Sequence, residues 1–143
     1  MSNGRTRTVM TVVATIGVAI SAYLTYVHYA GIQPFCTGIS DCERVQTSDW
    51  ALLAGVPVAL VGLLGYAGIL VALRVPGEAG RLATALLCFS GFGYSGYLTA
   101  VELVRIDAIC QWCVVSAALM TALAGLAALR VVRESGAAEL AGA

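Results

Sequence analysis

Long apolar segments separated by short polar ones dominate the hydropathy pattern of this chain. No formally charged side chain occurs between Arg7 and Asp41, and further uncharged runs cover residues 51–73, 82–101 and 108–129. A helix needs about 20 apolar residues to cross a hydrocarbon core about 30 Å thick. The pattern therefore predicts an all-α membrane protein with four transmembrane helices, at about residues 8–30, 51–73, 82–103 and 108–130, in one domain that covers residues 1–143.

Composition agrees with this pattern and excludes other classes of protein. Hydrophobic residues make up 59% of the chain and charged residues 11%, whereas a soluble domain carries about 25% charged residues. The chain is too apolar for a disordered protein. Its net charge of +0 argues against nucleic-acid binding, which needs a positively charged face.

Small residues recur within the predicted spans at helical spacing. These rows are Gly62, Gly65 and Gly68; Gly91, Gly93 and Gly96; and Ala117, Thr121 and Gly125. Small residues let helix backbones approach closely in a lipid environment, which favours a compact bundle over four separate anchors. The alternative is that they only reflect the ordinary composition of membrane helices.

The distribution of arginine predicts the orientation in the membrane. With a cytoplasmic N-terminus, six arginines lie on the cytoplasmic side and two, Arg44 and Arg105, lie outside, as the positive-inside rule requires. The C-terminus is then also cytoplasmic, and the tail after Arg133 is expected to be a solvated end. A signal peptide is the alternative for the first span, but the apolar run here is longer than the roughly 7–15 residues of the hydrophobic region of a signal peptide. A short turn at Pro76 and Gly77 makes the second and third spans antiparallel neighbours.

The predicted topology places four of the five cysteines on the extracytoplasmic side. Cys36 and Cys42 fall in the first outer loop, and Cys110 and Cys113 form a C-x-x-C pair at the outer end of the fourth span. Disulfides persist on this oxidising side of a membrane. Cys88 lies inside the third span, where a small buried apolar role is expected.

The C-x-x-C pair points to redox chemistry. Unpaired N–H groups in the first turn of a helix stabilise a thiolate at the leading cysteine, so such a pair exchanges readily between thiol and disulfide. Two other interpretations stay open. One is a metal site completed by Cys36, Cys42 and His28, although the spacing fits no common zinc motif. The other is a purely structural disulfide.

The first outer loop combines a flexible lead with a short helix. Turn residues around Pro34 predict a segment that can swing with Cys36. The sequence from Ser40 to Glu43 has the pattern of a capping box, which would begin a helix over residues 42–46. Cys42 would then stand at the start of that helix.

Two cysteine pairs on one side of a bundle suggest an electron relay. A mobile pair can collect two electrons by thiol–disulfide exchange and deliver them to a fixed pair, which then needs an oxidant. The sequence has no motif for haem, flavin or nucleotide, and the Asp and Glu residues, expected outside the spans, offer no site for hydrolysis. A lipid-soluble quinone that reaches the fixed pair through the bilayer meets this need.

The residues that carry this chemistry resemble the vitamin K epoxide reductase family in its bacterial form. The matching segments, in family order, are Cys36, residues 42–50, residues 55–57, Gly65 with Tyr66, and residues 110–113. The other quinone-linked disulfide-forming family, DsbB, has its C-x-x-C in the first outer loop rather than the second. The position of Cys110 and Cys113 therefore favours the first family.

This resemblance implies a role for each cysteine. Cys36 and Cys42 would be the shuttle pair, with Cys36 forming the mixed disulfide with a thioredoxin-like partner. Cys42 would pass the electrons to Cys110, and Cys113 would stand next to the quinone. The product would be quinol, and the function that of a quinone-dependent thiol oxidase in the bacterial plasma membrane. The quinone could be a menaquinone, a ubiquinone or a vitamin K type. No metal and no nucleic acid is expected.

Further residues are candidates for the quinone pocket. They are Ser48, Tyr66, Tyr94, Tyr97 and Trp112, in addition to Cys113. Each also has a structural interpretation: a hydroxyl at a helix end for Ser48, hydrogen bonding between helices for the tyrosines, and the aromatic belt of a membrane protein for Trp112.

The sequence departs from the family pattern in two respects. Vertebrate members hold the substrate oxygens with a tyrosine, where this chain has Ala117, and with an asparagine, whereas Asn3 is the only asparagine here. Reduction of vitamin K epoxide is therefore less expected than reduction of a simple quinone. Many bacterial members continue into a fused thioredoxin-like domain, so a chain that stops at Ala143 is expected to use a separate, DsbA-like partner. The rival function is a membrane scaffold or metal-binding protein with structural cysteines.

Overall fold

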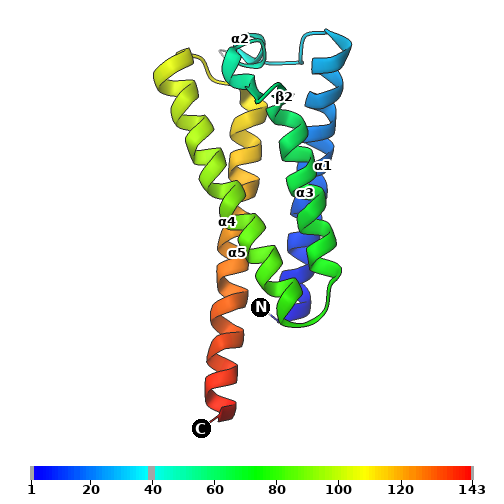
Figure 1. Ribbon diagram of the computed structural model, residues 1–143, viewed down its shortest axis with the longest axis vertical. Coiled ribbons are helices and arrows are strands. Elements are labelled where there is room, and N and C mark those ends of the chain that lie inside the picture. The colour runs from blue at the N-terminus through cyan, green and yellow to red at the C-terminus, as the bar shows by residue number, and fades with distance from the viewer. Residues whose placement is uncertain (1, 39–40, 143) are drawn as a thin grey trace.

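The computed structural model describes residues 2–38 and 41–142, and the fold is all-α apart from one short hairpin. The long helices are α1 (Asn3–Ala30), α3 (Val58–Arg74), α4 (Gly77–Val101) and α5 (Gln111–Gly142). The short elements are α2 (Cys42–Gln46), the 3-10 helix η1 (Asp49–Ala51), strands β1 (Leu52–Leu53) and β2 (Val56–Pro57), and the π-helical segment η2 (Glu102–Ile106). The α2 helix and the hairpin gather at the upper end of the long helices (Figure 1).

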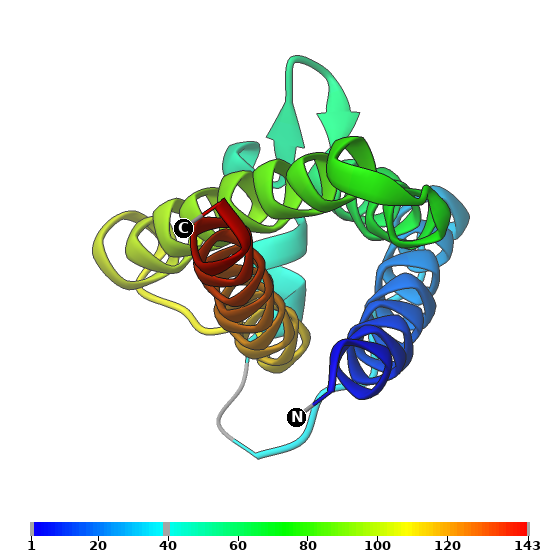
Figure 2. The same ribbon diagram turned by 90° about the horizontal axis from the view of Figure 1, so that it is seen from below.

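The four long helices form a closed bundle. Helix α1 packs against α3 and α5, and α4 packs against the same two helices, which gives the ring seen along the bundle in Figure 2. The buried core between them includes Met10, Tyr66, Ile69, Cys88 and Leu123. Cys88 is fully buried, as expected for a small apolar side chain.

Two of these helices are long and apolar enough to cross a membrane. By length and composition, α1 and α5 meet this condition among the described residues, and α3 is a shorter apolar helix of 17 residues. The prediction of an all-α protein is confirmed. The number of spans stays a prediction.

The second predicted span is shorter as a helix than the charge-free run suggested. Residues 51–57 form the end of η1 and a tight hairpin, in which Leu53 pairs with Val56. The two loop residues, Ala54 and Gly55, both have positive φ, 53° and 84°, as the commonest two-residue hairpin turn requires. Hydropathy alone did not reveal this because the hairpin is itself apolar. The helix therefore begins at Val58.

The other helix boundaries also differ from the predicted ones, because local features such as a proline set them and a hydropathy pattern does not detect these. Helix α4 begins at Gly77, five residues before the predicted span, because Pro76 ends the turn that was predicted there. Helix α5 begins at Gln111 rather than at residue 108. It continues to Gly142, so the expected tail is helical, although its last residues are exposed.

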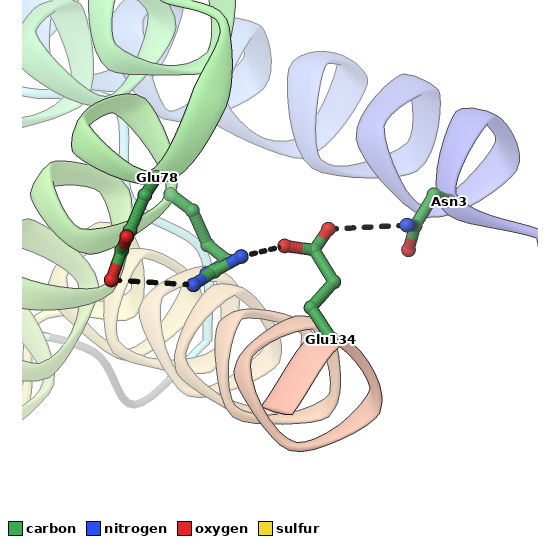
Figure 3. A network of polar contacts seen from close by, with 4 residues as sticks. Asn3, Glu78 and Glu134 are labelled. Carbon is green, nitrogen blue, oxygen red and sulfur yellow. Dashed lines mark hydrogen bonds and ion pairs between the residues drawn. The ribbon is translucent and has the colours of Figure 1, made fainter. Parts of the chain in front are cut away.

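A polar network joins the chain ends at the lower end of the bundle. Arg81 on α4 pairs with Glu134 on α5, and Glu134 accepts a hydrogen bond of 3.1 Å from the Asn3 amide on α1. Glu78 lies 3.8 Å from the other side of the same guanidinium (Figure 3). These contacts hold three long helices together on the side where the predicted orientation places the cytoplasm.

A tight contact between α1 and α3 depends on a glycine outside the rows named from sequence. A Cβ at Gly17 would lie 2.3 Å from Cε1 of Tyr66. The Tyr66 ring is 1% exposed, and its hydroxyl donates to the backbone oxygen of Ser116 on α5 at 2.9 Å. Of the predicted rows, Gly91 makes a comparable contact with Met120, whereas Gly125 has no atom within 4 Å of such a Cβ. Only some of the small residues therefore serve close packing.

We expect Gly17→Ala to destabilise the bundle by about 1–3 kcal/mol, as overpacking of a filled core does. The new methyl group forces the buried Tyr66 ring to move and weakens its bond to Ser116. Thermal unfolding in detergent micelles measures the effect. Gly125→Ala is the matched control, since it adds a methyl group to open space and raises helix propensity by up to about 1 kcal/mol. Equal melting temperatures for the two variants would contradict the prediction.

Candidate redox site

The structure brings the four outer cysteines into one cluster at the upper end of the bundle. Cys42 and Cys110 are buried there together with Val45, Val101, Ile106 and Ala108. Cys36, Cys113 and Trp112 are partly buried and pack against the same cluster. Two pairs that lie 68 or more residues apart in sequence thus share one apolar environment. Cys88 lies elsewhere, in the core between the long helices.

The loop pair is oxidised. Cys36 and Cys42 form a disulfide with their Cα atoms 6.3 Å apart. Cys42 is the first residue of α2 and is 1% exposed, whereas Cys36 is only partly buried. The bounds of α2 confirm the predicted helix over residues 42–46. Its N-cap is Asp41, whose carboxylate accepts the Arg44 backbone N–H at 3.2 Å, while Ser40 lies outside the described residues.

The lead segment before the disulfide is anchored on two helices. The Tyr23 hydroxyl on α1 accepts the backbone N–H of Phe35 at 2.9 Å, and the Trp112 indole on α5 donates to the Phe35 carbonyl at 2.7 Å. The side-chain oxygen of Gln111 accepts the backbone N–H of Thr37 at 3.2 Å. The sequence predicted a segment free to swing. The structure holds it beside the C-x-x-C pair, and Trp112 is one of the side chains that hold it.

The C-x-x-C pair is reduced. Cys110 is buried in the connection before α5, and Cys113 lies in the first turn of that helix. The side-chain amide of Gln46 on α2 donates toward both sulfurs at 3.9 Å. A hydrogen bond from the Cys113 thiol, opposed by burial, lowers the pKa of Cys110 from 9.0 to about 7. Cys110 therefore has substantial thiolate character near neutral pH, as an exchanging cysteine needs.

The ultraviolet thiolate absorbance of the reduced protein is expected to rise with pH with a midpoint near 7 for Cys110. The sign follows from the lowered pKa, since the thiolate is populated above it and protonated below it. In Cys113→Ala this midpoint moves to higher pH because the main hydrogen bond to the thiolate is lost. Cys110→Ser supplies the baseline. A midpoint that is the same with and without Cys113 would contradict this account.

An apolar cavity of about 310 Å³ opens beside Cys113. It runs between α1, α3, α4 and α5 below α2, and its lining includes four predicted pocket residues, Cys113, Ser48, Tyr66 and Tyr94. The Ser48 hydroxyl also donates to the backbone oxygen of Val45 at the end of α2. Tyr97 and Trp112 are not among the described residues that line it. Tyr97 stacks on Tyr94, with ring centroids 6.1 Å apart, and Trp112 contacts Tyr23 at 5.4 Å.

Glu102 is a member of the site that sequence reasoning missed. Like the other acids it is expected outside the spans, but it is 5% exposed and lines the cavity with Cys113. Its carboxylate accepts the backbone N–H of Cys110 at 3.3 Å. The available signal was its position: it is the one acid between Arg81 and Arg105, eight residues before the C-x-x-C pair, in an otherwise apolar stretch.

The metal interpretation finds no further ligand set in the described part of the chain. No group of three or more His, Cys, Asp or Glu side chains there could hold a metal ion.

Comparison with known proteins shows the family of this chain. Residues 8–128 match the model of the vitamin K epoxide reductase family. Over 83 residues, 57% of this chain, the sequence is 35% identical to the thiol-disulfide oxidoreductase LTO1 of Arabidopsis thaliana, of which the match spans 22%. The family consists of membrane proteins, in accord with the apolar helices α1 and α5. The match over most of the chain establishes that this chain belongs to the vitamin K epoxide reductase family.

Proposed function

We propose that this protein is a quinone-dependent thiol oxidase. A reduced thioredoxin-like protein gives two electrons to the Cys36–Cys42 disulfide, Cys42 passes them to the Cys110–Cys113 pair, and a membrane quinone takes them from there. The partner leaves with a new disulfide and the quinone leaves as quinol, so electrons and protons balance. The partner then oxidises thiols in exported proteins.

The observation that carries this proposal is the pairing of a closed disulfide with a reduced C-x-x-C pair in one buried cluster. The partly exposed sulfur of Cys36 offers a point of attack, while the sulfur of Cys42 is turned into the cluster that contains Cys110. Thiol–disulfide exchange needs such direct access between sulfurs. If the cysteines only stabilised the loops, a reduced pair beside an oxidised one would not be needed.

The cavity beside Cys113 supports a quinone as the electron acceptor. Its lining is mostly apolar, with hydroxyl groups from Ser48, Tyr66 and Tyr94. Pockets for small ligands commonly combine apolar walls with a few polar groups that fix orientation. Ser90 on α4 lines the cavity and is exposed, and Phe89 beside it is exposed as well, so a ligand dissolved in lipid tails would meet this helix directly. The chemistry accommodates a menaquinone, a ubiquinone or a vitamin K type alike.

The proposed orientation places α1, α3, α4 and α5 across a bacterial plasma membrane with both chain ends in the cytoplasm. The start of α1, the turn between α3 and α4, and the far part of α5 share the lower end of the bundle (Figure 1). These segments carry the six arginines assigned to the cytoplasmic side. Helix α3 has 17 residues and rises about 26 Å. The apolar hairpin above it extends the hydrophobic length on the outer side.

The test is a reconstituted reaction. The purified protein in detergent is mixed under anaerobic conditions with a reduced thioredoxin-like protein and a soluble menaquinone analogue. We expect one quinol for each disulfide formed in the thioredoxin-like protein, measured by quinol absorbance and by thiol counting. Disulfide formation without quinol, or no reaction in either direction, would overturn the proposal.

A further inference from the structure

The buried carboxyl group of Glu102 stands where the redox reaction releases a proton. Among the acids of the described chain, Glu102 is the one that is buried. It lies at the junction of α4 and η2, in the connection that leads to Cys110. Burying a carboxyl group away from water is costly unless it is hydrogen-bonded, so the burial of Glu102 beside two reactive cysteines calls for a role.

Three contacts define the position of this carboxyl group. The backbone N–H of Cys110 donates to Oε2 at 3.3 Å and holds the group in place. The Cys113 thiol lies near enough to interact with the carboxyl group. The carboxyl group also faces the cavity that Cys113 lines. Glu102 thus shares the lining of the proposed quinone pocket with Cys113 and is held there by the backbone of Cys110.

The proton balance of the reaction shows that a base is needed at this place. With Cys110 as thiolate, joining the two sulfurs releases two electrons and the proton of the Cys113 thiol. A quinone that becomes quinol takes up these two electrons and two protons. One proton can come from Cys113, and the second comes from water. Within the buried cluster, a base must accept the first proton and hand it on.

We propose that Glu102 is a catalytic residue that accepts the proton of Cys113 and delivers it to the quinone oxygen in the cavity. This inference rests on the proposed function, since it names the proton carrier of the same site.

The electrostatic surroundings suit this role. Burial raises the pKa of the Glu102 carboxyl above its ordinary value, and the hydrogen bonds from Cys110 and Cys113 act against the rise. A proton carrier works best when its pKa lies between those of its donor and acceptor and near the working pH. The titratable groups that face it are the two cysteines of the C-x-x-C pair; Cys42, on the neighbouring helix α2, is held in the disulfide.

The first experiment separates the two half-reactions in Glu102→Gln. Glutamine keeps an oxygen that accepts the Cys110 N–H but carries no proton between groups. We expect quinol formation by the pre-reduced variant to slow about a hundredfold, the scale of general acid–base catalysis, while disulfide exchange with the reduced thioredoxin-like protein keeps the wild-type rate. Glu102→Asp should restore part of the quinol step. Asp107→Asn is the matched control: this acid lies in the same connection, is exposed, and has φ of 52°, which asparagine tolerates well.

The second readout needs no quinone. Infrared difference spectra are recorded while diamide oxidises the C-x-x-C pair of the reduced protein. We expect a carboxyl band that changes with the redox state in the wild type and in Asp107→Asn, and that is missing in Glu102→Gln.

The outcomes distinguish this inference from the proposed function. A Glu102→Gln protein that forms quinol at the wild-type rate, or that is slowed equally in both half-reactions, would overturn the role of Glu102 while leaving the thiol oxidase intact. A wild-type protein that forms no quinol would instead overturn the proposed function. Loss of the infrared band together with a slowed quinol step establishes the proton carrier.

Discussion

Cys113→Ala is expected to abolish quinol formation, down to the rate seen without the protein. Cys113 lines the cavity proposed for the quinone and supplies the second sulfur of the C-x-x-C pair. Without it, Cys110 has no partner in the C-x-x-C pair with which to form a disulfide, so two electrons cannot leave the pair together. The measurement is quinol absorbance in the reconstituted reaction with a reduced thioredoxin-like protein.

The matched control is Cys88→Ala. Cys88 is the other free cysteine that lies within a long helix, but it is buried in the core away from the redox cluster. This variant should form quinol as the wild type does. Quinol formation that survives in Cys113→Ala would exclude the relay through the C-x-x-C pair.

Cys42→Ala is expected to accumulate a mixed disulfide between Cys36 and the thioredoxin-like protein. When the reduced variant meets the oxidised partner, the Cys36 thiolate attacks the partner's disulfide, one intermolecular bond forms and one partner thiol is released. In the wild type, the sulfur of Cys42 can attack this bond and resolve it. The variant lacks that sulfur, so quenching with an alkylating agent preserves the adduct for a non-reducing gel.

Cys36→Ala provides the comparison that tests which sulfur faces the partner. It retains Cys42, but that side chain is 1% exposed and should react poorly with a protein-sized disulfide. We expect roughly tenfold less adduct than with Cys42→Ala, since reactivity follows thiolate access. Equal amounts of adduct in the two variants would mean that the loop opens and that Cys36 is not the entry point.

Much of the fold could be predicted from the sequence because its strongest signal is local. The length of the apolar runs indicates the long helices. Gly31 follows the end of α1, and Pro57 and Pro76 directly precede α3 and α4. The helix over residues 42–46 was placed correctly for a similar reason. Capping is a contact between residues three positions apart, so the sequence contains both partners. The prediction used Ser40 and Glu43, whereas the structure caps the helix with Asp41, which accepts the Arg44 N–H.

Boundaries inside apolar runs could not be predicted in the same way. The hairpin of residues 52–57 is as apolar as the helix that follows it, so the change from helix to strand leaves no mark in hydropathy. Likewise, the row pattern of glycines did not single out Gly17. Its importance comes from the Tyr66 ring of another helix, and a contact between distant segments has no sequence spacing to reveal it.

The sequence by itself determined the membrane character, the two cysteine pairs and the family, because composition and motif spacing are properties of the chain alone. Only the tertiary structure decided that the pairs share one cluster, that Trp112 anchors the loop at Phe35, and that Glu102 lies buried in the lining of the cavity beside Cys113. The physical reason is the same in each case. Burial and hydrogen bonding between groups far apart in the chain arise only when the helices pack, and it is this packing that turns an ordinary acid of a connecting segment into a candidate for proton transfer.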